Sequence, residues 1–126
     1  MLVLCLAIMA LAVTSCVDNS PAGVAKEYLE SIKAGDYKKT VELMHFNKEL
    51  SDDDKEQLVS FFNDKAGKSI NAKQGITSYS IDNTEVADDG QSASITYTIN
   101  YGDGSSDTND GKVVKVGDEW KIDSGK

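Results

Sequence analysis

Apolar residues recur every three to four positions in three segments between residues 21 and 66, which predicts three helices. Ser20 and Pro21 suit the N-cap and first turn of the first helix, and Gly35 suits its end. Asp36 caps the second helix; Ser51 opens the third, and Gly67 is expected to end it. The apolar positions of the three helices are, in order, Val24, Ala25, Tyr28, Leu29 and Ile32; Tyr37, Val41 and Met44; and Leu58, Phe61, Phe62 and Ala66, which we expect to form the buried side of the third helix.

From about residue 70 the apolar residues alternate with polar ones, which predicts about four antiparallel strands. Residues 93–101 have the clearest alternation, with Ala, Ile and Tyr on one face and Ser, Thr and Asn on the other. Turn signals lie at residues 88–90, 102–104 and 117–118. We therefore expect an α+β fold in which the N-terminal helices pack on one face of a curved antiparallel sheet.

The chain opens with twelve uncharged apolar residues, 2–13, followed by Thr14, Ser15 and Cys16. This run is shorter than the roughly 17–25 residues that span a bilayer, but it fits the apolar region of a signal peptide. It resembles a bacterial lipoprotein signal, in which the cysteine receives the lipid. We expect a signal peptide over 1–15, lipidation of Cys16, a tether over 16–20 and one domain over 21–126.

Lipidation would attach the protein to the bacterial cell envelope, with the outer membrane or the cell surface as the expected place. Its partner there is the membrane, through the lipid on Cys16, because several acyl chains anchor a protein stably. Signal peptides normally begin with Lys or Arg, whereas this one begins Met1-Leu2-Val3. We therefore expect the true start to lie a few codons upstream.

The charge of the chain limits its partners. Its 13 basic residues are all lysine, there are 21 acidic residues, and the net charge is −8. The lack of arginine and the acidic balance argue against nucleic acid and polyanionic ligands. Both cysteines lie in the first 16 residues, so the domain has no thiolates for zinc. Residues 103–111 are rich in oxygen but lack EF-hand spacing, which favours a solvated hairpin loop; no metal or cofactor is expected.

Two segments resemble the nuclear-transport-factor-2-like (NTF2-like) superfamily, which is also called cystatin-like. Residues 21–37 are similar to its opening, in which a helix ends in Gly-Asp and the next helix begins at once, and residues 113–122 are similar to its closing hairpin. Within that group the chain resembles small lipoproteins of domain-of-unknown-function family 4878. The resemblance implies a cone, with a curled sheet around a helix and a pocket at the open end. Some relatives are isomerases or dehydratases that use an Asp or His in this pocket, whereas others bind ligands or form dimers.

Two residues are candidates for acid–base chemistry in such a pocket. His45 is the only histidine, and it is expected at the end of the second helix, where a capping role also suits it. Glu85 continues one face of the strand over 76–86, although Val86 breaks the alternation. Five aromatic residues are candidates for lining the pocket, with ordinary core positions as the alternative: Tyr28, Tyr79, Tyr97, Tyr101 and Trp120.

Three functions compete. The favoured hypothesis is a non-enzymatic, lipid-anchored envelope domain that binds a small ligand or a partner protein. The second is an isomerase- or dehydratase-like enzyme with an acid or base in the pocket. The third is a structural or assembly lipoprotein that forms a homodimer through the Ser/Thr face or the rim of the sheet.

Overall fold

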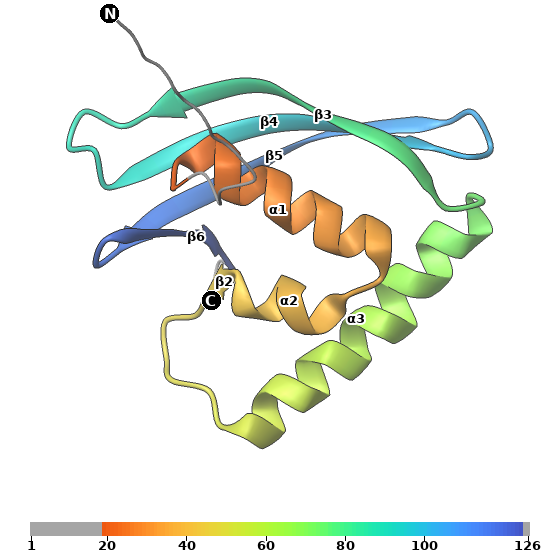
Figure 1. The fold of residues 1–126 in the computed structure, drawn as a ribbon, viewed down its shortest axis with the longest axis horizontal. Coiled ribbons are helices and arrows are strands. Elements are labelled where there is room, and N and C mark those ends of the chain that lie inside the picture. Colours follow the sequence, from red (N-terminus) through yellow and green to blue (C-terminus); the bar gives the residue numbers. More distant parts are fainter. Residues whose placement is uncertain (1–18, 125–126) are drawn as a thin grey trace, which may run out of the picture.

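The computed structural model describes residues 19–124, so the predicted signal peptide and Cys16 lie outside the described residues. Within this range the chain forms three helices and five strands (Figure 1). The helices are α1 (Pro21–Ala34), α2 (Tyr37–Glu42) and α3 (Asp52–Ala72), and the strands are β2 (Met44–His45), β3 (Ile76–Val86), β4 (Ser92–Tyr101), β5 (Ser106–Val116) and β6 (Glu119–Asp123). No helix within residues 19–124 is long and apolar enough to cross a bilayer.

The sheet has the strand order β2-β6-β5-β4-β3. The four long strands pair antiparallel, as expected. The fifth strand, β2, was not expected, and it pairs parallel with β6, with Met44 beside Ile122. The sheet is therefore mixed and has five strands rather than about four, because the chain after α2 extends and adds to the free edge of β6.

Capping residues fix the ends of α1. The Ser20 hydroxyl accepts a hydrogen bond from the Gly23 amide at 3.0 Å. Gly35 adopts φ 77°, a left-handed conformation that glycine reaches without strain, and its amide bonds to the end of the helix. Asp36 follows and caps α2, so the two helices meet at a sharp angle. The buried hydroxyls of Ser31 and Thr40 join them at 2.7 Å.

The core lies between α1 and the sheet. Val24 and Ala25 of α1 contact Ile95 of β4 and Val113 of β5, and all four are buried. α1 therefore lies across the concave face of the sheet, as Figure 1 shows, and its apolar side has the partner that the sequence predicted.

Two expectations about α2 and the β4–β5 hairpin were wrong. α2 ends at Glu42, so Met44 and His45 belong to β2 and not to a helix. β5 begins at Ser106, so most of residues 103–111 form a strand rather than a loop. Both differences arise because backbone pairing with a neighbouring strand outweighs weak local propensity.

α3 also differs from the prediction. Its capping box is as expected, since the Ser51 hydroxyl accepts from the Asp54 amide and the Asp54 carboxylate accepts from the Ser51 amide. Gly67 does not end the helix, which continues to Ala72 and stops where Gln74 and Gly75 take positive φ. No residue of α3 is buried, because the helix packs against α2 and lies away from the sheet (Figure 1).

Candidate functional site

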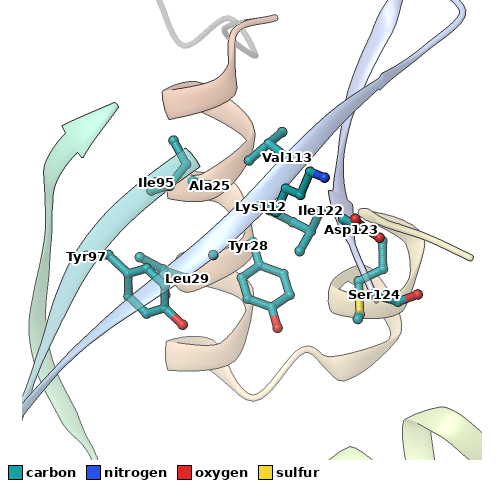
Figure 2. Close-up of a pocket in the computed structure, with 12 residues that line it drawn as sticks. Ala25, Tyr28, Leu29, Ile95, Tyr97, Lys112, Val113, Ile122, Asp123 and Ser124 are labelled. Carbon is teal, nitrogen blue, oxygen red and sulfur yellow. The ribbon is translucent and has the colours of Figure 1, made fainter. Parts of the chain in front are cut away.

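A cavity of about 220 Å³ lies between α1 and the concave face of the sheet. Figure 2 shows side chains from the helix and from several strands around it. The lining residues are mostly apolar, with polar groups at the edge: Ala25, Tyr28, Leu29, Met44, Ile95, Tyr97, Gly111, Lys112, Val113, Ile122, Asp123 and Ser124. A largely apolar hollow with a few polar groups is typical of a small-ligand site.

Regular periodicity brings the helical lining residues together. Tyr28 and Leu29 lie three and four positions after Ala25, so all three share the side of α1 that faces the sheet. Ile95 and Tyr97 are two positions apart on β4 and face α1 for the same reason.

Gly111 provides space in the cavity. It pairs with Ile95 in the β4–β5 ladder and lines the cavity. Because glycine has no side chain, the space at this point stays open. A Cβ atom built there would lie 3.6 Å from Cε1 of Tyr97, which is an ordinary van der Waals distance. Residue 111 can therefore carry a side chain, but one larger than a methyl group would extend into the space beside Tyr97.

Two tyrosines supply the polar groups among the apolar residues. Burial raises the pKa of Tyr28 to about 12, and the nearby Tyr97 adds to the shift. Burial also raises the pKa of Tyr97, with a contribution from the negative charge of Asp110. Both phenols are therefore neutral at physiological pH, which suits them to donate hydrogen bonds rather than to act as bases.

The other three predicted aromatic residues do not line the cavity. The Tyr79 hydroxyl donates to Glu30 of α1 at 2.5 Å. Lys73 places Nζ 4.6 Å from the centre of the Tyr101 ring. Trp120 packs against the edge of the core. These three therefore occupy core and rim positions, whereas Tyr28 and Tyr97 line the cavity.

Neither candidate acid–base residue lies at this cavity. His45 is in β2 and lines a different hollow, of about 440 Å³, together with residues of the segment that follows β2. Glu85 is an exposed residue near the end of β3 and pairs with Ser94. The break in alternation at Val86 reflects a register shift between Ile81 and Asn83, which turns Glu85 away from the core.

Sequence reasoning missed the polar edge of the cavity. Asp123 and Ser124 border it at the end of β6, and Lys112 borders it on β5. The end of β6 forms this edge because β2 pairs with it, and the two residues of β2 are too few to produce a periodic signal. Asp123 is the one carboxylate among the lining residues. Within residues 19–124 no group of three or more His, Cys, Asp or Glu residues is placed to hold a metal ion.

A family model described as "Domain of unknown function (DUF4878)" matches residues 14–123. Among solved structures, the chain is similar to a "Putative NTF2-like transpeptidase" from Campylobacter jejuni, with a TM-score of 0.67 and 16% identity over 82% of this chain and 97% of that one. This similarity confirms the expected NTF2-like α+β fold.

Two further structures match less closely. The intermembrane space region of the chloroplast protein ARC6 has a TM-score of 0.44 and 14% identity, over 85% of this chain and 95% of that one. Aln2 from a Streptomyces species has a TM-score of 0.41 and 14% identity, over 78% of this chain and 79% of that one. The comparison with curated proteins finds no match.

Proposed function

We propose that this chain, which belongs to the family described as "Domain of unknown function (DUF4878)", is a lipid-anchored domain of the bacterial cell envelope that binds a small, largely apolar ligand. The observation that carries the binding proposal is the cavity between α1 and the sheet. Its volume of about 220 Å³ suits a small ligand or one group of a larger ligand. The two neutral tyrosine hydroxyls favour a ligand with a hydrogen-bond acceptor, such as a carbonyl or ether oxygen.

The residues at the cavity support ligand binding rather than catalysis. The neutral phenol of Tyr28 is a poor base at physiological pH. His45 and Glu85 lie elsewhere, so the runner-up, an isomerase- or dehydratase-like enzyme, would have to use Asp123 at the cavity edge. An Asp123→Asn variant separates the two functions. Binding by the cavity survives this substitution, whereas turnover by an acid–base enzyme does not.

A thermal-shift screen tests the binding proposal. The full-length chain in phospholipid nanodiscs is heated with small apolar carbonyl compounds and ethers, with empty nanodiscs as the baseline. A ligand at 100 times its dissociation constant stabilises the folded protein by about 2.7 kcal/mol. Tyr28→Phe and Tyr97→Phe are expected to reduce the shift, because each removes one hydroxyl donor. Ligands that stabilise all three proteins equally would place binding outside this cavity.

The anchor has a separate test. Cys16 follows the apolar segment 2–13 directly after Thr14 and Ser15, and this arrangement supports lipidation. Cells that express the full chain should incorporate labelled palmitate into it, and a Cys16→Ala variant should not. Equal labelling of the two proteins would contradict the proposed anchor and leave the cavity proposal unaffected.

A further inference from the structure

Phe61 is exposed on one side of α3, next to the partly buried Leu58. The helix packs against α2, where the Phe62 ring stacks on Tyr37 with the centroids 6.4 Å apart. Leu58 and Phe61 lie beside this contact and, with Phe46 and Leu50, line an open groove. Phe61 is 55% exposed, more than any other large hydrophobic side chain within residues 19–124.

Charged residues lie on the same side of α3 as Phe61, both before it and after it in the chain. Asp54 lies seven residues before Phe61, and Lys68 lies seven residues after it. Seven residues are close to two helical turns, so all three side chains leave α3 in nearly the same direction. Leu58 and Lys65 fall on this stripe as well. We call these five residues the α3 stripe.

The charges on the stripe differ before and after Phe61. Asp54 of the acidic first turn precedes Phe61, whereas Lys65 and Lys68 follow it; elsewhere on α3, Lys55 and Glu56 lie in the first half and Asp64 in the second. Within residues 19–124, neither of these two lysines forms an ion pair with a carboxylate. The stripe therefore has an acidic residue before, and two basic residues after, an exposed aromatic residue.

We infer that the α3 stripe is the contact surface of a homodimer in which two α3 helices pack antiparallel about a two-fold axis at Phe61. This geometry sets Phe61 against the partner's Phe61 and Asp54 against the partner's Lys68, because the two charged residues are equally far from Phe61 in opposite directions. A parallel arrangement would place like charges together. Asp54, Phe61 and Lys68 of the stripe are thus complementary to the same residues of the partner, as a two-fold interface requires.

The charges also favour a second copy over a lipid surface. Only Asp54 of the acidic first turn lies on the same side as Phe61, but the whole chain has a net charge of −8. An anionic bilayer would repel a chain of this charge, and the stripe has only two lysines, whereas membrane-binding helices are rich in Lys and Arg on their polar side. The homodimer does not depend on the cavity or its ligand.

Disulfide trapping tests the geometry. Phe61→Cys is introduced into the full-length chain, and membranes from expressing cells are oxidised with copper phenanthroline. Residue 61 lies on the two-fold axis, so its two copies come within disulfide reach. Asn71→Cys is the matched control: it is exposed on the same helix, but ten residues from the axis, which separates its two copies by about 30 Å. The wild-type chain gives the background from Cys5 and Cys16.

We expect Phe61→Cys to give a covalent dimer at least ten times more abundantly than Asn71→Cys. Phe61→Asp should weaken dimerisation at least tenfold in light scattering of the detergent-solubilised full chain, with an unchanged helix content by circular dichroism because residue 61 is exposed. Equal trapping at positions 61 and 71, or a monomeric wild-type chain at high concentration, would overturn the homodimer. So would a monomer whose Phe61 inserts into vesicles, since the bilayer would then cover the stripe.

Discussion

Tyr28 and Tyr97 determine what the cavity can do at the scale of single residues. Tyr28 lies on α1 and Tyr97 on β4, and both side chains line a largely apolar cavity (Figure 2). Both phenols are neutral at physiological pH, and burial raises the pKa of Tyr28 further, to about 12. This favours the proposed binding of a ligand with hydrogen-bond acceptors over catalysis by a tyrosine base.

The pKa of Tyr28 predicts a pH dependence of stability. The unfolded phenol ionises near pH 10, whereas the folded phenol resists ionisation until about pH 12. The stability that Tyr28 contributes is therefore fully present below pH 10 and is lost as the pH rises toward 12. The free energy of unfolding of the wild type, minus that of Tyr28→Phe, should fall by up to about 2.7 kcal/mol between pH 9 and 12. Urea unfolding measures this difference, and a constant difference would contradict the assignment.

At the scale of elements, backbone hydrogen bonds connect the segment that follows α3 to the segment that follows β4. The Gly102 amide donates to the Gly75 carbonyl at 2.9 Å, and the Asp103 amide donates to the Lys73 carbonyl at 3.0 Å. A Cβ atom on Gly102 would lie 2.3 Å from the Gln74 carbonyl oxygen. This contact is too close for any side chain, so glycine is required there.

Gly102→Ala should therefore lower the free energy of unfolding by about 2–3 kcal/mol, because the backbone must move and the two hydrogen bonds lengthen. Gly111→Ala is the matched control. Its Cβ atom meets ordinary van der Waals contact at 3.6 Å, so stability should change by less than about 1 kcal/mol. Denaturant unfolding of both variants checks the pair. Equal losses would show that the approach at Gly102 is not tight.

The elements also show what local sequence can predict. The caps at Ser20, Gly35 and Ser51 were predicted because capping depends on a few adjacent residues. The end of α3 was misplaced because one glycine costs a helix only about 1 kcal/mol, which neighbouring turns can offset. Periodicity predicted that Phe61 lies on the apolar side of α3, but local sequence does not determine which element, if any, covers that side.

At the scale of the whole molecule, the fold was predictable and the cavity was only partly so. Alternation along β4 and the apolar side of α1 predicted that these two faces pack together. Tyr28 and Tyr97 lie on these faces, so their place at the cavity was predictable. The contribution of Gly111 depends on the register between β4 and β5, and that of Asp123 depends on the end of β6. Register and short parallel pairings are long-range properties that one strand's pattern does not contain.

Gly111 offers the most direct test of the central claim that this cavity holds a small ligand. Gly111→Leu should fill the space beside Tyr97, whereas Thr108→Leu adds the same side chain to an exposed position of the same strand. Native mass spectrometry of the full-length chain released from nanodiscs would detect a bound small molecule. We predict such a molecule on the wild type and on Thr108→Leu, and its loss from Gly111→Leu at unchanged secondary structure. An equally loaded Gly111→Leu chain would contradict the account.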